Sequence, residues 1–261
     1  MERITSRQNS IVAQYRAAAR GDAANVLLLD GAHLVNDALA AQIPLQHLMV
    51  AAESTESADI EPLLTLAVAQ HTAVAAASAK VMEAASPVRS SSPIIALANR
   101  KQLASDVYSA TRPLVLIACD VQDPGNLGAI VRVAEAAGAS GLIAAGQCAD
   151  PHSWKALRGS MGSALRLPIG IRDTAEEAAA EARRHRCRVV ATVPRGGTPL
   201  STSDLRAPVA ILIGGEGHGL PTALVEAADV RVTIPMQAPV ESLNAAVTAA
   251  LVAYEARRQR S

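Results

Sequence analysis

The second half of the chain alternates short apolar runs with stretches in which apolar residues recur at helical spacing. The runs have the length of buried strands, and the stretches between them have the length of helices. This alternation predicts an α/β fold with a mostly parallel sheet. The predicted strands cover residues 114–119, 141–145, 188–193, 209–214 and 230–234, and the predicted helices cover 128–138 and 174–186.

A weaker form of the same pattern fills the first hundred residues and predicts a small α/β domain. The predicted strands cover residues 26–30, 45–50, 72–77 and 93–98, and the predicted helices cover 33–42, 60–70 and 78–86. The polar stretch 98–113 separates the two patterns and has the composition of a linker. We therefore predict two domains, residues 1–105 and 106–261.

The composition fits a globular protein. Half of the 261 residues are hydrophobic, which is enough to build a substantial core. No apolar run reaches the roughly 18–20 residues that span a bilayer, and the first residues lack the apolar stretch of a secretory signal. We expect a cytoplasmic protein that makes no membrane contact. Because Cys119, Cys148 and Cys187 form no CxxC pair, we expect buried thiols and neither a disulfide framework nor a metal site.

The net charge is zero, yet the basic residues are clustered. Residues 1–20 hold four arginines and one acid, and residues 151–172 hold four basic residues and no acid; 183–188 is a third basic cluster. Such clusters are often solvated helix faces, but arginine also suits bidentate contact with phosphate. Arg7, Arg158 and Arg166 are the candidates for RNA binding. Since the chain has no Phe, one Trp and three Tyr, it should recognise RNA by backbone and shape.

The stretch 120–138, DVQDPGNLGAIVRVAEAAG, joins a predicted strand to a predicted helix. Its Asp-Pro-Gly is a turn signal, and Asn126 is placed to cap the helix. The glycine spacing differs from the GxGxxG of dinucleotide-binding folds. Arg132 lies within an otherwise apolar helix. It is either a solvated side chain or a cation held over a site at the carboxyl end of the sheet.

Two further stretches are rich in glycine and serine. LRGSMGSALRLPI, residues 157–169, is either a surface loop or a place where another backbone or a ligand approaches closely. ILIGGEGHGL, residues 211–220, places four glycines around Glu216 directly after a predicted strand. It lacks the GK[ST] of a P-loop, and a carboxylate would repel a triphosphate. Glu216 therefore suits a neutral or cationic ligand, or the orientation of an arginine.

The stretch 234–251, IPMQAPVESLNAAVTAAL, leads from the last predicted strand into the last predicted helix. Ser242 is placed to cap a helix that runs from Leu243 to Arg258. Its apolar stripe comprises Leu243, Val247, Ala250, Leu251 and Tyr254. Capping does not account for Glu241, Ser242 and Asn244 together, so this junction is a further candidate for chemistry.

In order and spacing, these stretches resemble the signature motifs of the SpoU/TrmH family of RNA methyltransferases, in the SPOUT superfamily. The pattern N-x-x-[AGT]-x-x-R is matched by Asn126 and Arg132, GxEGxGL by residues 214–220, and IPM…SLN by residues 234–244. The RGSMGS stretch also resembles a loop of the family. The first hundred residues resemble its substrate-binding domain, which is similar to a small ribosomal-protein fold, chiefly through LLLDGAHLVNDAL.

The resemblance implies a C-terminal domain that is tied in a deep trefoil knot, which is a rare exception among folds. It implies that S-adenosylmethionine binds in the knot, held by backbone groups near Gly214, Ile234, Met236 and Leu243. It also implies a homodimer whose sites draw on both subunits, with the apolar C-terminal helix as a candidate interface.

The activity implied by the resemblance is methyl transfer to a ribose 2′-hydroxyl of structured RNA. Arg132 would orient the ribose or a phosphate and stabilise the developing alkoxide. It would not act as the base, because a guanidinium holds its proton too tightly to be present in the free base form. Glu216 would hold Arg132 or the ligand. Ser242 and Asn244 would donate hydrogen bonds near the ribose and the cofactor, and Asn126 would fix the substrate end.

Alternatives remain at this stage. Ribosomal RNA is preferred over transfer RNA because a separate N-terminal domain of this kind accompanies ribosomal targets, which is an argument by analogy. The alternatives are a tRNA 2′-O-methyltransferase and a non-catalytic RNA-binding protein of the same fold. A nucleotide- or NAD-dependent enzyme is disfavoured because the chain has neither a P-loop nor GxGxxG.

Overall fold

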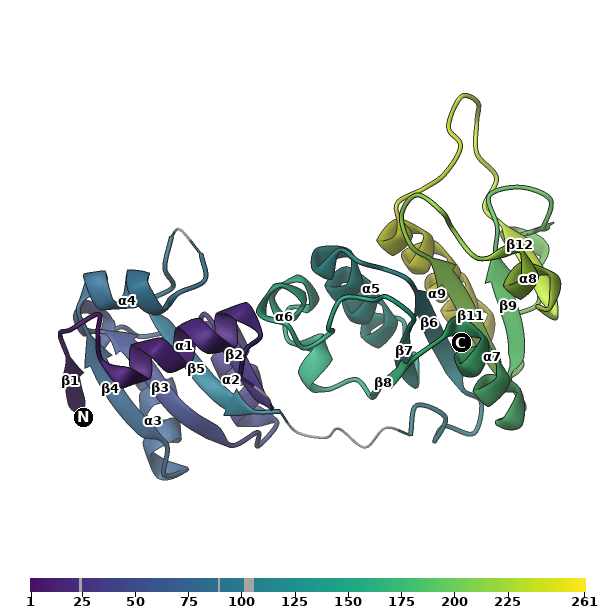
Figure 1. Ribbon diagram of the computed structural model, residues 1–261. Coiled ribbons are helices and arrows are strands. Elements are labelled where there is room, and N and C mark those ends of the chain that lie inside the picture. Colours follow the sequence, from purple (N-terminus) through teal and green to yellow (C-terminus); the bar gives the residue numbers. More distant parts are fainter. Residues whose placement is uncertain (24, 89, 101–105) are drawn as a thin grey trace. The chain divides into compact units, whose positions relative to one another are not determined.

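The computed structural model describes residues 1–23, 25–88, 90–100 and 106–261, which form two compact units (Figure 1). Unit 1 comprises Met1–Gln102 and His152–Leu165, and unit 2 comprises Leu103–Pro151 and Arg166–Ser261. The boundary predicted near residue 105 lies outside the described residues. Residues 152–165, which follow a strand of unit 2 along the chain, group with unit 1 and not with the rest of the predicted second domain.

Unit 1 is built on a five-stranded mixed sheet of order β1-β4-β3-β5-β2. The pairs β1–β4 and β3–β4 are parallel, whereas β5 runs antiparallel to both β2 and β3. The strands are β1 (Glu2–Ile4), β2 (Val26–Asp30), β3 (Leu45–Ala51), β4 (Ala73–Ala77) and β5 (Ile94–Asn99). The helices are α1 (Ser10–Arg20), α2 (Ala32–Ala40), α3 (Glu61–Ala69), α4 (Ala79–Ala85) and α6 (Trp154–Ser160), with short 3₁₀ turns at Ala52–Ser54 and Ser163–Leu165.

The predicted strands and helices of the first domain are confirmed, but β1 and α1 were not predicted. Helix α1 buries only Val12 and Tyr15, so its apolar periodicity is thin. Tyr15 is fully buried, and its hydroxyl lies 3.1 Å from His47 Nδ1 and donates to the carbonyl oxygen of His47 at 3.2 Å. Burial raises the pKa of Tyr15 and lowers the pKa of His47.

The stretch 157–169 is packed and is not an exposed loop. Ser160 is completely buried, and Ser163 is 3% exposed. The interpretation as a surface loop is therefore wrong, and the close approach of another backbone or of a ligand stays a prediction.

Unit 2 is built on a seven-stranded sheet of order β10-β12-β9-β11-β6-β7-β8, and every neighbouring pair is parallel. The prediction of an α/β fold with a parallel sheet is confirmed. The strands are β6 (Leu114–Cys119), β7 (Gly141–Ala145), β8 (Ile169–Arg172), β9 (Arg188–Thr192), β10 (Thr198–Pro199), β11 (Val209–Gly214) and β12 (Val230–Thr233).

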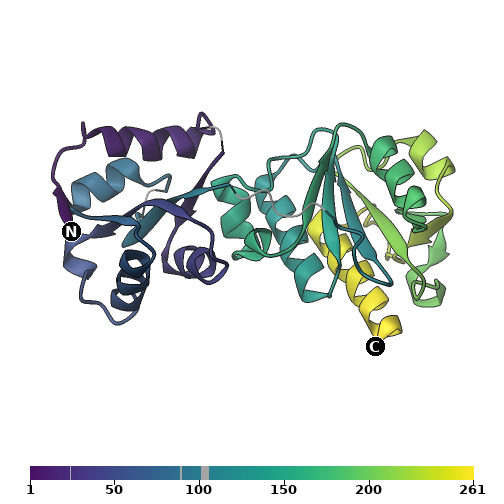
Figure 2. The ribbon, with the colours of Figure 1, turned by 90° about the horizontal axis from the view of Figure 1, so that it is seen from below.

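The helices of unit 2 cover both faces of this sheet (Figure 2). They are α5 (Pro124–Ala136), α7 (Ala175–Arg184), α8 (Thr222–Glu226) and α9 (Ala245–Arg260), with a 3₁₀ turn at Leu200–Thr202. Helices α5 and α9 pack against each other, and α7 packs alanines onto the central strands. Strand β8, strand β10 and helix α8 were not predicted. In the described part of the chain, no helix combines the length and hydropathy needed to cross a bilayer.

Candidate active site

Three loops that follow β6, β11 and β12 meet at the carboxyl edge of the parallel sheet, where ligands bind in folds of this kind. The first loop enters α5 through Asp123, whose Oδ1 accepts from the backbone N–H of Asn126 at 2.7 Å. The prediction that Asn126 caps this helix is wrong. Asn126 is the third residue of α5, because Asp123 takes the cap and Pro124 the first position. Its side chain is therefore available for contacts with other loops.

The third loop enters α9 through Asn244. Its Oδ1 accepts from the backbone N–H groups of Ala246 at 2.9 Å and Val247 at 3.3 Å. The prediction that Ser242 caps this helix is also wrong, because α9 begins at Ala245 and Ser242 lies in the preceding loop. The amide group of Asn244 remains for a second contact.

The side chains of Asn244, Asn126 and Glu216 form a continuous hydrogen-bonded chain. Asn244 Nδ2 donates to Asn126 Oδ1 at 3.0 Å, and Asn126 Nδ2 donates to Glu216 Oε1. The central amide thus acts as acceptor and donor at once, through its oxygen and its nitrogen. Three of the five predicted catalytic residues, distant in sequence, are brought together.

The glycine-rich loop after β11 holds Glu216 in place by packing backbone against backbone. A Cβ at Gly214 would lie 2.5 Å from the carbonyl carbon of Gly219, and one at Gly215 would overlap the carbonyl oxygen of Asp120. Gly217 adopts a φ of 91°, in the region that favours glycine. The density of glycine is thus needed for the loop to fold.

A cavity of about 670 Å³ opens beside these three hydrogen-bonded side chains. Its volume is typical of small-molecule sites. All four residues predicted to bind the cofactor line it, and so do Glu216, Ser242 and Asn244. The predicted four are Gly214, Ile234, Met236 and Leu243. The wall is mainly apolar, with hydroxyl groups of Thr192, Ser242 and Thr248 and the ionisable side chains of Arg195, Glu216 and His218.

Sequence reasoning missed Arg195, Thr192 and His218. Thr192 is the last residue of β9 and Arg195 follows it, and the carboxyl end of β9 lies at the same edge of the sheet as that of β11. A cation directly before Gly196 and Gly197, after a buried strand, is the signal that could have identified this loop.

Arg132 lies apart from the chain of hydrogen bonds. It is exposed, six residues beyond Asn126 on α5 and therefore about 9 Å further along the helix axis. It does not line the cavity, and it makes no hydrogen bond or ion pair with the described residues. Glu216, which was expected to hold Arg132 or the ligand, is bonded to Asn126.

The three arginines predicted to bind RNA have different surroundings. Arg166 forms a bidentate pair with Glu135, both contacts at 2.8 Å. Arg158 Nη1 donates to Asp30 Oδ2 at 3.2 Å. Arg7 is exposed in the loop before α1. None of the three lines the cavity of unit 2.

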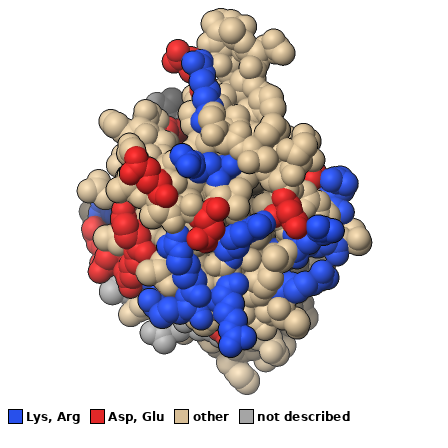
Figure 3. All heavy atoms as spheres, turned by 90° about the vertical axis from the view of Figure 1, so that its right-hand side faces the viewer, with Lys and Arg blue, Asp and Glu red and all other residues tan. Residues whose placement is uncertain are grey.

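In the cluster 183–188, Arg183, Arg184 and Arg186 are exposed, whereas Arg188 is half-buried and donates to the carbonyl oxygen of Asp204. On the face in Figure 3, Lys and Arg side chains are interspersed with Asp and Glu. Arg183 donates to the carbonyl oxygen of Ala227 at 2.5 Å and lies 3.8 Å from the carboxylate of Asp229.

The thiols show no sign of reactivity. Cys119 and Cys187 are buried, Cys148 is half-buried, and burial raises the pKa of all three. Across residues 1–23, 25–88, 90–100 and 106–261, no three His, Cys, Asp or Glu side chains are grouped so as to hold a metal ion.

A parallel sheet with a small-molecule cavity at its carboxyl edge defines an α/β ligand-binding protein. Residues 113–254 match the model of the SpoU rRNA methylase family. An uncharacterized tRNA/rRNA methyltransferase of Synechocystis is 33% identical, over 98% of this chain and 94% of the relative. The chain belongs to the SpoU rRNA methylase family and is an RNA methyltransferase.

Two further similarities bear on substrate and cofactor. The 23S rRNA (guanosine(2553)-2′-O)-methyltransferase RlmP of Bacillus subtilis is 29% identical, over 89% of each chain. The crystal structure of an rRNA methyltransferase from Sinorhizobium meliloti with bound AdoMet (S-adenosylmethionine) superposes with a TM-score of 0.85 at 30% identity, covering 98% of this chain and 97% of that one. The family uses S-adenosylmethionine as its methyl donor.

Proposed function

We propose that this protein transfers a methyl group from S-adenosylmethionine to a ribose 2′-hydroxyl of structured ribosomal RNA. The observation that carries the proposal is the chain Asn244–Asn126–Glu216 beside the cavity, because it joins all three family motifs in one site. The similarity to a 23S rRNA 2′-O-methyltransferase over most of the chain supports both the ribose target and the ribosomal substrate.

The cavity fits the cofactor. The side chains of Ile234, Met236 and Leu243 offer apolar contact to an adenine ring, and the loop of Gly214 brings backbone groups to the wall. The carboxylate of Glu216 favours a cationic ligand. When bound, S-adenosylmethionine supplies an electrophilic methyl group on a sulfonium. The cofactor would be held by four residues, Gly214, Ile234, Met236 and Leu243. Gly214 and Leu243 would act through backbone groups.

The contribution of this chain to the reaction is chiefly positioning. A substitution at the methyl carbon needs the attacking oxygen in line, and alignment alone lowers the barrier substantially. The hydrogen bonds from Asn244 to Asn126 and from Asn126 to Glu216 hold the ends of α5, α9 and the glycine loop in register. Ser242 would donate to the ribose, which is supported by its position on the cavity wall.

Arg132 supplies the electrostatic part. Its guanidinium stabilises the negative charge that develops on the ribose oxygen, while the proton of that hydroxyl passes to water and not to the arginine. An exposed arginine that makes no bond with the described residues can reach a phosphate or ribose delivered by the substrate.

The proposal includes three features of the assembly. The segment after β12 forms a trefoil knot, which is supported by the contacts of α9 with α5, β6 and β11. Two chains form a homodimer through α9, which is supported by the exposure of Val247, Leu251 and Tyr254 on that helix. Unit 1, which includes most of the predicted first domain, is a ribosomal-protein-like domain that binds the RNA. The enzyme acts in the cytoplasm.

The test is incubation of the purified protein with radiolabelled S-adenosylmethionine and either total ribosomal RNA or total transfer RNA from cells that lack the gene. We expect label in ribosomal RNA, at a position that resists alkaline cleavage because the 2′-hydroxyl is blocked. Label in transfer RNA alone would move the substrate to that class. Cofactor binding by calorimetry with no label in either pool would contradict the proposed activity on mature RNA, and no cofactor binding would favour a non-catalytic RNA-binding protein.

A further inference from the structure

Unit 1 contains a buried carboxylate whose hydrogen bonding is incomplete. Asp30 ends β2, and its side chain is 0% exposed. Its Oδ2 accepts from Arg158 Nη1 at 3.2 Å, whereas its Oδ1 has no partner among the described residues. A buried carboxylate is costly unless both oxygens are bonded, and a buried ion pair often stabilises no more than apolar packing would. Stability therefore gives a weak reason for Asp30.

Arg158 uses one of its donor groups in this pair. Its side chain is 47% exposed, and its Nε and Nη2 atoms make no hydrogen bond with the described residues. A guanidinium carries five N–H donors in a rigid fork that matches phosphate. The pair thus fixes one end of the group and leaves the remaining donors to solvent or to a ligand.

The helix that carries Arg158 is firmly packed in unit 1. The indole of Trp154 packs against the core, and its Nε1 donates to the carbonyl oxygen of Ala19 at 3.1 Å. Ala156 and Leu157 are completely buried. Lys155, three residues before Arg158, is exposed on the same helix face, and residues 151–172 contain no acid. The surroundings of Arg158 on its own segment favour an anion.

We propose that Arg158 binds a backbone phosphate of the RNA substrate and that Asp30 is a positioning residue, which holds the guanidinium in the orientation that this contact needs. The proposal rests on the proposed function in so far as RNA is the substrate. Phosphate is the expected group because the chain has few aromatic side chains on which bases could stack. Pre-orientation strengthens the contact by reducing the side-chain entropy lost on binding.

The experiment measures binding of an unmodified 23S ribosomal RNA transcript to the full-length protein over a series of salt concentrations. Arg158→Ala should raise Kd about tenfold. It should also reduce the slope of log Kd against log salt by about 0.7–0.9, the loss of one phosphate contact. Asp30→Asn keeps the shape of the side chain, and it should raise Kd although it removes a negative charge.

The matched control is Asp37→Asn, which makes the same change of charge in unit 1 at a residue paired with His33. General electrostatics predicts that both aspartate variants bind a polyanion equally well or more tightly. The proposal predicts opposite directions for the two. In the double variant Asp30→Asn/Arg158→Ala, the aspartate change should add nothing to the arginine change, because Asp30 acts through Arg158.

Equal or tighter binding by a folded Asp30→Asn protein, or an unchanged salt slope in Arg158→Ala, would overturn the proposal, and so would a wild-type protein that does not bind the transcript. If Asp30→Asn fails to fold, Arg158→Lys is the deciding variant. It keeps the charge without the fork, so binding should weaken while the salt slope stays the same. Methylation of the same transcript is assayed separately, so that a phosphate site without label contradicts only the proposed function.

Discussion

The two edges of the parallel sheet in unit 2 use polar side chains in opposite ways. At the carboxyl edge, Asn126, Glu216 and Asn244 bond one another beside a cavity, and Glu216, Asn244 and the hydroxyl of Ser242 lie on its wall. Most of these groups retain donors or acceptors that are not used within the protein. This edge is built to meet a ligand.

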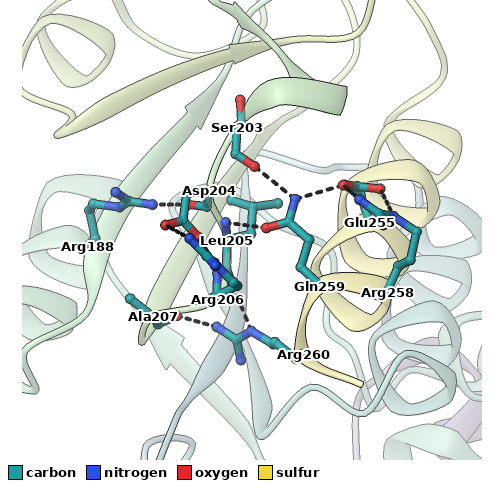
Figure 4. A network of polar contacts seen from close by, with 10 residues as sticks. All are labelled: Arg188, Ser203, Asp204, Leu205, Arg206, Ala207, Glu255, Arg258, Gln259 and Arg260. Carbon is teal, nitrogen blue, oxygen red and sulfur yellow. Dashed lines mark hydrogen bonds and ion pairs between the residues drawn. The ribbon is translucent and has the colours of Figure 1, made fainter.

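At the opposite edge, polar side chains form hydrogen bonds with backbone groups (Figure 4). Arg260 donates to the carbonyl oxygens of Leu205 at 2.8 Å and Ala207 at 2.5 Å, and to those of Arg112 and Pro113 just before β6. Gln259 donates to the carbonyl oxygen of Ser203 and accepts from the N–H of Leu205. These contacts satisfy loop carbonyls and leave little for a partner.

One helix links the two edges. Asn244 caps the start of α9, and Arg260 is its last residue, about 24 Å away along the axis. The contrast teaches that polar residues at the two ends of one helix have different surroundings: one end lies beside a cavity, and the other is bonded to loop carbonyls. Substitutions at the carboxyl edge should therefore reduce activity with little effect on stability, and substitutions at the opposite edge should do the reverse.

The largest effect is expected for Arg132→Ala. Loss of a cation that stabilises the developing alkoxide should lower the methyl-transfer rate by about 10²–10³-fold. The melting temperature and cofactor binding by calorimetry should be unchanged, because Arg132 is exposed and does not line the cavity. Arg184→Ala, at an exposed arginine on α7, is the control and should retain full activity. Full activity in Arg132→Ala would remove this residue from the mechanism.

Asn126→Ala should have the next largest effect. It removes both hydrogen bonds of the central amide, so α5, α9 and the glycine loop lose their mutual register, and activity should fall by about 10–100-fold. Asn244→Ala breaks the same chain but also removes a helix cap. The double variant should be little less active than the worse single one. Additive losses would show that the two residues act independently.

The sequence alone predicted much of this edge but not its connections. The cavity residues were identified because glycines and polar side chains follow buried strands. In a parallel sheet the carboxyl ends of the strands lie at the same edge, so these residues come together in one site. The two caps were assigned incorrectly, since Asp123 and Asn126, or Ser242 and Asn244, are equally good capping residues by type. Pro124, which favours the first position of a helix, was the local signal for Asp123. The contacts of Asn126 with Glu216 and Asn244, 90 and 118 residues away, are contained in no local pattern.

The network around Arg260 escaped prediction for the same reason. Its acceptors are backbone carbonyls, which carry no residue-type signal, and the arginine itself resembles any basic residue in a last helical turn. The grouping of residues 152–165 with unit 1 was likewise missed, because it depends on the packing of the partly buried Trp154 against a core formed by distant residues.

Arg260→Ala should lower stability and leave the chemistry intact. Loss of the charged donor from the part-buried carbonyls of Leu205 and Pro113 should reduce the free energy of unfolding by about 2–3 kcal/mol. The melting temperature should fall by roughly 5–10 °C. Arg257→Ala is a matched control in the same turn, where one long contact of 3.4 Å to the carbonyl oxygen of Ala136 is lost. It should change the melting temperature far less. A greater loss of kcat than of stability in Arg260→Ala would break the contrast between the two edges.

The smallest effect is a pH dependence that belongs to the network and not to the site. Hydrogen bonds from Arg258 and then Gln259 hold the pKa of Glu255 at about 2, below its ordinary value. Because the folded pKa is lower than the unfolded one, Glu255 contributes its stability above about pH 4.3 and loses it as the pH falls towards 2.

Glu255→Gln should therefore flatten the decline of melting temperature in this window, whereas Glu226→Gln, at an exposed residue of α8, should not. The amide groups of Asn126 and Asn244 do not titrate, so the hydrogen bond between them should persist in this window while the contact of Arg258 with Glu255 weakens. An identical decline in Glu255→Gln and wild type would show that this ion pair, although closely bonded, adds nothing to stability.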